Sequence, residues 1–323
     1  VTTIVIPSRL AAENPEVAET LLQAEALFIA GGNQWHYVNY WKDSPVHEAI
    51  QYLVNEKGIT VGGTSAGLAI LGEVVFTAEN NTVWSSEALS DPYHFRVKLD
   101  REFLSLPFME QLITDSHYNR PESDGMDRKG RHMAFMARMV TDWNMQAKGI
   151  GVNEYTAVAV DAAGKARVFG HPQYDDFAYF LKAGDQAPEL CQEGEPLHWW
   201  GDAQAVKVYK IAGDFQANNW FSLENWSEGQ GGTWYYWFVN QGVLVEEIAG
   251  ESAAQIRFVL RHGVNEAPLQ GVSVFLESQG EKITDANGHA LFSGLETGQD
   301  LMWEASLSGY FSETGSISVS GAI

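Results

Sequence analysis

The chain has 323 residues, of which 45% are hydrophobic, enough for one large domain and a smaller one with buried cores. Its 42 acidic residues outnumber 20 lysines and arginines, giving a formal net charge of −22. This balance argues against nucleic acid or an anionic membrane as a partner, because both need basic surface. A single cysteine, Cys191, excludes an internal disulfide and any metal site built from several cysteines.

The first part of the chain alternates strand and helix patterns. Residues 1–6 (VTTIVI) predict a buried strand, and residues 15–24 predict a helix. The apolar run at residues 26–30 predicts a second strand that ends at Gly31-Gly32. Strand, helix and strand in this order are typical of an α/β fold.

A second helix is expected after Ser44-Pro45, because serine is a common N-cap and proline is favoured at the first helical position. Its predicted apolar face consists of Val46, Ala49, Ile50, Leu53 and Val54. A strand at residues 59–61 and a helix from Ala66 follow. The alternation predicts a doubly wound, mostly parallel sheet with helices on both faces, in a domain that covers residues 1–250.

The end of this domain, residues 193–250, has a different texture. It contains strand-like runs such as residues 205–211, and six of the eleven tryptophans lie between Trp199 and Trp237. The simplest interpretation is a β extension packed with aromatic side chains. A sugar-binding surface or a homodimer surface is the alternative.

The last segment, residues 251–323, reads as all β. Short strand patterns with turns between them predict a small β-sandwich domain without catalytic groups. The predicted strands are 255–260, 271–276, 290–292 and 301–307, and the predicted turns are 284–288 and 294–298. The sequence of this segment resembles the carboxypeptidase regulatory-like, transthyretin-type domain.

The strongest local signal is Gly63-Thr64-Ser65-Ala66-Gly67, which has the form G-x-S-x-G between a predicted strand and a predicted helix. Such a turn exposes the serine hydroxyl, and small flanking residues let the backbone turn without a clash. The start of the helix favours negative charge near Ser65. The alternative is a glycine-rich turn with an incidental serine.

A serine nucleophile needs a base and a group that orients the base. The nine histidines are His36, His47, His94, His117, His132, His171, His198, His262 and His289. His117 follows a predicted strand at residues 112–115, and Glu154 follows another at residues 149–153, so both are expected at the sheet edge where ligands bind. A locally hydrogen-bonded histidine and a surface carboxylate are the ordinary alternatives.

The loop Gly31-Gly32-Asn33-Gln34 offers backbone N–H groups of the kind an oxyanion hole requires. No phosphate-binding glycine motif and no metal-ligand spacing occurs in the chain, so no cofactor and no metal are expected. No stretch is long and apolar enough to span a bilayer.

The order of five runs resembles the cyanophycinase-like and dipeptidase E-like serine peptidases. They are LFIAGGNQ (27–34), GGTSAGLAILG (62–72), DSHY (115–118), DRKGR (127–131) and GIGVNEYTA (149–157). The resemblance implies a class I glutamine amidotransferase-like fold and hydrolysis of peptide or isopeptide bonds next to aspartyl residues. It implies a triad of Ser65, His117 and Glu154.

The resemblance also implies an oxyanion hole from N–H groups near Gly32 and of Ala66. Substrate contacts are implied for Gln34, Asp115, Arg128 and Arg131. The two arginines are three residues apart, so on a helix they would face the same way and could bind a carboxylate of an acidic peptide substrate. Cyanophycinases usually have Asp-Gln-His-Phe where this chain has Asp-Ser-His-Tyr, and residues 119–126 here separate the histidine from the arginines.

Two other functions fit parts of the sequence. An α/β-hydrolase esterase also uses G-x-S-x-G, and its base would be His171 or His198. A secreted binding protein on a retired hydrolase fold would use the aromatic cluster and the tail.

The cellular location is suggested only indirectly. The acidic balance and the regulatory-like tail favour a secreted or periplasmic protein. Since the family normally has more strands ahead of the GG loop, we expect the natural protein to extend N-terminally, with another strand and an export signal.

Overall fold

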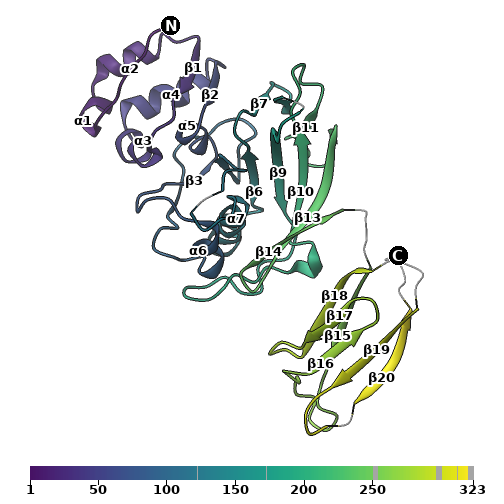
Figure 1. The fold of residues 1–323 in the computed structure, drawn as a ribbon. Helices are drawn as coiled ribbons and strands as arrows, with labels where there is room; N and C mark the ends of the chain where they lie inside the picture. The colour runs from purple at the N-terminus through teal and green to yellow at the C-terminus, as the bar shows by residue number, and fades with distance from the viewer. Residues whose placement is uncertain (122, 172, 250–253, 296–299, 311, 319–323) are drawn as a thin grey trace. The chain divides into compact units, whose positions relative to one another are not determined.

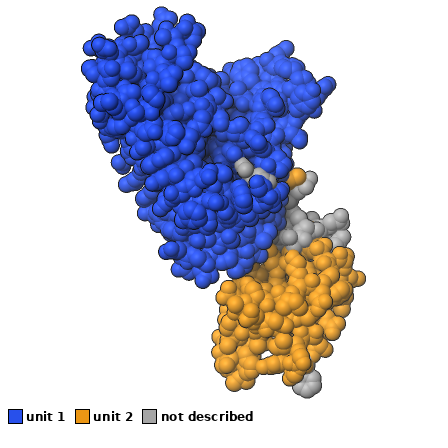
Figure 2. All heavy atoms as spheres, turned by 60° about the vertical axis from the view of Figure 1, so that its left-hand side comes forward, with its two compact units in different colours: residues 1–247 blue, residues 248–323 orange. Residues whose placement is uncertain are grey.

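The computed structural model describes residues 1–121, 123–171, 173–249, 254–295, 300–310 and 312–318 (Figure 1). The chain divides into two units, Val1–Glu247 and Ile248–Ile323 (Figure 2). None of the helices in these described ranges combines the length and hydropathy of a membrane span.

The chain begins with four helices and a small parallel sheet. The helices are α1 (Arg9–Ala12), α2 (Pro15–Leu21), α3 (Gln34–Trp41) and α4 (Pro45–Asn55), and the strands are β1 (Ala26–Ile29) and β2 (Thr60–Gly63). The Oγ atom of Ser44 accepts a hydrogen bond from the His47 N–H and caps α4, with Pro45 at its first position. The five apolar residues expected on its inner face are buried. This helix is therefore confirmed, cap and face together.

The expected strand at residues 1–6 is wrong. These residues lie outside every helix and strand of the described chain, and Val1 and Val5 are exposed. Ile4 and Ile6 pack against the core of the helical region instead. The apolar residues of this segment thus join the core shared by the helices and by β1 and β2 without pairing in a sheet.

An eight-stranded sheet forms the centre of the first unit, in the order β14-β13-β10-β9-β6-β5-β3-β4 among the described residues (Figure 1). Its strands are β3 (Val74–Phe76), β4 (Leu99–Arg101), β5 (Leu112–Ser116), β6 (Lys148–Val152), β9 (Phe177–Ala183), β10 (Val206–Ala212), β13 (Gly232–Asn240) and β14 (Val243–Ile248). Pairing is parallel between β3 and β5 and between β5 and β6, whereas β9 and β10 pair antiparallel. The α/β character is confirmed, but the sheet is mixed rather than mostly parallel.

The other elements of this unit cover the sheet or extend it. They are α5 (Ala66–Ala69), α6 (Ser85–Ser90), α7 (Lys129–Trp143) and the short 3-10 helix η1 (Gly201–Ala203). A separate four-stranded sheet consists of β7 (Ala157–Val160), β8 (Lys165–Phe169), β11 (Trp220–Ser222) and β12 (Gly229–Gln230). Helix α7 packs against β5 and β6, so it lies directly behind the two strands that lead to the site.

The aromatic-rich segment belongs to these sheets. It contributes β10, β13 and β14 to the central sheet, and Trp199 and Trp237 are fully buried. Trp226 is 4% exposed and belongs to a second core cluster, which also contains Tyr209 and Phe221. Half of the six tryptophans therefore act as core residues.

The second unit consists of strands in its described part. They are β15 (Ala254–Val259), β16 (Ser273–Leu276), β17 (Gly280–Ile283), β18 (His289–Leu295), β19 (Asp300–Ser306) and β20 (Glu313–Ser318). They form a two-stranded and a four-stranded sheet around one apolar core. The turn expected at residues 294–298 starts inside β18, and its residues 296–298 lie outside the described part, as do 251–253 and 319–323.

Candidate active site

Ser65 lies at the turn between β2 and α5. Its backbone has φ +53° and ψ −120°, which is strained for a residue with a side chain. A Cβ on Gly63 would lie 2.9 Å from the Leu68 nitrogen and closer still to the carbonyl oxygen of Gly67. A Cβ on Gly67 would lie 2.7 Å from the Ala30 carbonyl oxygen. Gly63 is thus required by the tightness of the turn, and Gly67 by the close approach of the backbone at the end of β1.

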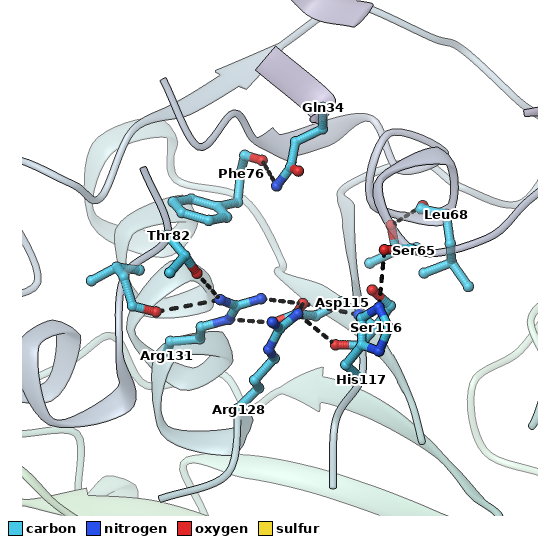
Figure 3. A network of polar contacts seen from close by, with 12 residues as sticks. Gln34, Ser65, Leu68, Phe76, Thr82, Asp115, Ser116, His117, Arg128 and Arg131 are labelled. Atoms are coloured by element: carbon cyan, nitrogen blue, oxygen red, sulfur yellow. Dashed lines mark hydrogen bonds and ion pairs between the residues drawn. The ribbon is translucent and has the colours of Figure 1, made fainter. Parts of the chain in front are cut away.

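His117 and Glu154 follow neighbouring parallel strands, since Ser116 of β5 is opposite Val152 of β6. The distance from Nε2 of His117 to Oγ of Ser65 is 2.9 Å, and that from Nδ1 to Oε1 of Glu154 is 2.7 Å (Figure 3 draws the first). The three side chains therefore form one continuous hydrogen-bonded chain.

The carboxylate of Glu154 determines which atom donates in each of these two hydrogen bonds. An ionised carboxylate only accepts hydrogen bonds, so Nδ1 of His117 carries the proton that bonds to Glu154. Nε2 is then left with a lone pair that accepts the hydroxyl proton of Ser65. The histidines of the esterase alternative lie elsewhere: His171 packs against Tyr174 and Phe215, and His198 pairs with Leu190.

The GG loop lies beside the nucleophile. A Cβ on Gly31 would be 3.1 Å from Cβ of Ser65, so Gly31 contacts the serine more closely than Gly32, which faces the Tyr37 hydroxyl. That hydroxyl is 3.0 Å from the Ala30 carbonyl oxygen and 3.1 Å from that of Gly31, within range to donate to either. Ala66 begins α5, where a backbone N–H has no partner four residues back. The GG loop and the N–H group of Ala66 thus both lie next to Ser65.

The nucleophile lines a cleft of about 520 Å³ that also includes His117 and Glu154. Phe28 of β1 and Tyr155 are exposed on its walls. A second cleft of about 710 Å³ shares Tyr155 and Ala157 with the first. The two clefts therefore adjoin at Tyr155 and Ala157.

Two of the predicted substrate contacts are buried against each other. Arg131 donates to Asp115 from Nε at 2.8 Å and from Nη2 at 2.6 Å, and the two side chains are 3% and 4% exposed (Figure 3). Nη1 of Arg131 donates to Oγ1 of Thr82 at 2.9 Å. Arg131 and Asp115 were expected to contact the substrate. In this structure they instead bind each other.

Arg128 and Gln34 also have intramolecular partners. Nη1 of Arg128 donates to the Ser116 carbonyl oxygen at 3.0 Å. Nε2 of Gln34 donates to the Phe76 carbonyl oxygen at 3.2 Å. Gln34, Asp115, Arg128 and Arg131 are absent from the lining of the cleft that holds Ser65.

Electrostatics in this region are dominated by burial and by one ion pair. Burial alone would raise the pKa of Asp115, but the charge of Arg131 and its hydrogen bonds hold that pKa below the ordinary value. His132 follows Arg131 on helix α7, and burial lowers its pKa to about 4. His132 is fully buried and packs edge-on against Tyr118, so at neutral pH it is an uncharged core residue.

This histidine predicts an acid-sensitive stability. The pKa of an unfolded histidine is near 6.5, so between pH 6.5 and 4 the unfolded chain binds a proton that the folded chain does not. The contribution is complete above pH 6.5, and about 3 kcal/mol is lost as the pH falls through this window. Urea unfolding of wild type and His132→Leu at pH 7 and 4.5 measures it. An equally steep decline in both proteins would contradict the assignment.

Three residues of the site were missed by sequence reasoning. Tyr37 fixes the GG loop, and Oδ1 of Asn119 accepts a hydrogen bond from the N–H of Glu154 at 3.0 Å. Tyr155, with φ +62°, connects the two clefts. Only Tyr155 carried a signal, since it directly follows Glu154. In the described part of the chain, no cluster of three or more His, Cys, Asp or Glu is placed to bind a metal ion.

Comparison with known proteins places the site within a matched region. The sequence model of Peptidase family S51 matches residues 7–167. Cyanophycinases of Trichormus variabilis and a Nostoc species are each 25% identical over 165 residues, 51% of this chain and 49% of theirs. That of Geminocystis herdmanii is 24% identical over 151 residues, 47% of this chain and 48% of its own.

The chain thus spans about half the length of the curated relatives it matches. Among solved structures, a peptidase from an acI-B1 Actinobacterium is 16% identical, with a TM-score of 0.41 over 67% of both chains.

Proposed function

Through residues 7–167 the chain belongs to peptidase family S51, and from this premise we propose that it is a serine peptidase with Ser65 as nucleophile, His117 as base and Glu154 as the acid. This family has a class I glutamine amidotransferase-like α/β fold. The observation that carries the proposal is the hydrogen-bonded chain from Glu154 through His117 to Ser65. We infer from the sequence resemblance that the scissile peptide or isopeptide bond lies next to an aspartyl residue.

The proposed reaction is acyl transfer in two steps. Oγ of Ser65 attacks the carbonyl carbon while Nε2 of His117 takes the hydroxyl proton, and Glu154 stabilises the imidazolium. N–H groups of Ala66 and of the GG loop donate to the oxyanion, at roughly 3 kcal/mol of transition-state stabilisation per donor. The amine leaves with the proton from His117, and water activated by His117 then releases the acyl group from Ser65.

Active-site labelling tests the proposal directly. A fluorophosphonate should label Ser65 in the wild-type protein, and peptide mapping should locate the adduct there. A peptide library of aspartyl and isoaspartyl bonds then identifies the substrate. Labelling that requires His171 or His198 but not His117 would favour the esterase alternative, and absence of any labelling would favour a binding protein.

The lining of the second cleft indicates what kind of residue lies beside the scissile bond of the substrate. Exposed aromatic rings of Tyr155, Tyr174 and Phe215 line it. Asp176 and Asp214 also line it, but both accept hydrogen bonds from N–H groups of their own loops. Aromatic faces beside carboxylates favour a cationic side chain, so we propose that a basic residue beside the scissile bond enters this cleft.

Asp175 provides the test of this specificity. It is exposed, lines the cleft, and its carboxylate has no hydrogen-bond or ion-pair partner within the described ranges. Asp175→Asn should lower kcat/KM about tenfold on a peptide with arginine at this position and leave the citrulline peptide unchanged. Asp161→Asn is the matched control, because Asp161 lies in the turn between β7 and β8 and does not line the cleft. Equal losses on both peptides would contradict a charge-reading role.

A further inference from the structure

We propose that Asp115, Arg128 and Arg131 are positioning residues, which hold the backbone in front of His117 and thereby keep its imidazole on Ser65. This inference rests on the proposed function. It replaces the role in substrate binding that the sequence motifs imply for these three residues. The side chains of these residues point toward one another and toward the backbone of Ser116 (Figure 3).

Asp115, Arg128 and Arg131 form a network of polar contacts with the backbone of Ser116. Its first part is the buried ion pair between Arg131 and Asp115. Arg131 and Asp115 form a two-bond fork, and Arg131 is further fixed by Thr82 and by the carbonyl oxygen of Val83. Its backbone N–H donates to Oγ of Ser85 at 3.0 Å. All three nitrogens of the Arg131 side chain therefore have partners within the protein, and the side chain is 3% exposed, so its charge is directed at Asp115 rather than at the cleft.

The second part acts on Ser116, the residue directly before the base. Its N–H donates to Oδ1 of Asp115 at 2.9 Å, and its carbonyl oxygen accepts from Nη1 of Arg128 at 3.0 Å. The carbonyl oxygen of Ser116 is thus bound directly by Arg128, the N-cap of α7, and its N–H is bound by Asp115, which Arg131 of the first turn of α7 holds in turn.

His117 needs such support because its own backbone is strained. Its φ is +52°, a left-handed conformation that a residue with a side chain adopts at a cost. It directly follows β5, and the backbone beyond it is held by the Tyr118 N–H, which donates to the Val152 carbonyl oxygen of β6 at 3.1 Å. Helix α7 is packed against β5 and β6. The contacts of Arg128 and Arg131 therefore hold the backbone before His117 in a fixed position relative to the sheet.

Kinetics distinguish the two roles. A substrate contact affects KM and only for peptides that carry the matching carboxylate. A positioning residue affects kcat on every peptide, because misplacement of the base weakens proton transfer from Ser65 regardless of the side chain bound.

The variants are chosen so that they fold. Removing one partner of the buried pair leaves the other charge unpaired, so both are neutralised together in Asp115→Asn with Arg131→Gln. Arg128→Met removes the bond to Ser116 and the longer ion pair of Arg128 with Asp115 at 3.8 Å, and it keeps the pair between Arg131 and Asp115. Arg138→Met is the control: Arg138 lies on α7 and pairs with Asp142, away from His117.

The experiment measures kcat and KM on an acidic and a neutral peptide, together with the low-field proton resonance of His117 Nδ1–H, assigned by its loss in His117→Gln. Both network variants should lose kcat about 10- to 100-fold on both peptides, with KM within about twofold and the resonance lost or broadened. The control should match wild type.

The opposite result is equally clear. A rise in KM confined to the acidic peptide, or an unchanged resonance in both network variants, would overturn the proposal. Because the resonance does not depend on turnover, it decides the positioning role even if the fluorophosphonate fails to label Ser65. That failure would count against the proposed function alone.

Discussion

Replacing Ser65 with alanine is expected to lower kcat on the order of 10⁵- to 10⁶-fold while the protein remains folded. The substitution removes the hydroxyl of Ser65, which lies 2.9 Å from Nε2 of His117, and it keeps the Cβ, so the strained φ of +53° is neither relieved nor worsened. Steady-state hydrolysis and thermal unfolding of the purified variant measure both parts.

His117→Ala should be about as damaging, and the double variant should be no worse than either single one. The members of such a triad act as a unit, so their losses do not add. His132→Leu is a useful comparison, because it removes a histidine that lies in the core behind the same strands. Wild-type turnover in Ser65→Ala on any accepted substrate would contradict the mechanism.

The second large effect is expected from a single methyl group at Gly63. A Cβ there would be 2.9 Å from the Leu68 nitrogen and closer to the Gly67 carbonyl, backbone atoms that cannot rotate away. Gly63→Ala should therefore lower the free energy of unfolding by about 3 kcal/mol or more and abolish labelling of Ser65.

The neighbouring glycine is the matched control. A Cβ on Gly62 would lie 3.5 Å from a ring carbon of Phe28, which is an ordinary contact. Gly62→Ala should thus change the free energy of unfolding by less than about 1 kcal/mol. Urea unfolding of the two variants side by side makes the comparison. Equal stability of both would show that the turn around Ser65 relaxes freely.

The sequence alone located the features that depend on neighbours along the chain. Helix α4 was readable because Ser44, Pro45 and the spacing of five apolar residues act within three turns. The turn at Ser65 was readable from the motif itself, and the atoms that require glycine at position 63 belong to Gly67 and Leu68 of the same turn. His117 and Glu154 were proposed because a predicted strand ended just before each, although only the resemblance singled them out among the alternatives.

Tertiary structure decided what depends on partners far along the chain. Residues 1–6 alternate like a strand, but a strand exists only where another strand is available to pair with it, and here they pack on helices. The mixed direction of the sheet follows from β9, β10 and β13 pairing antiparallel, which their short local patterns do not encode.

The arginines show the same limit at the level of single side chains. Their spacing places Arg128 and Arg131 near one another, yet it does not say whether the carboxylate they meet belongs to a substrate or to the protein. Only the fold brings Asp115 at the end of β5 against the first turn of α7, where it forms a buried two-bond ion pair with Arg131. The sequence determined which groups exist at the site, and packing determined which of them remain available for chemistry.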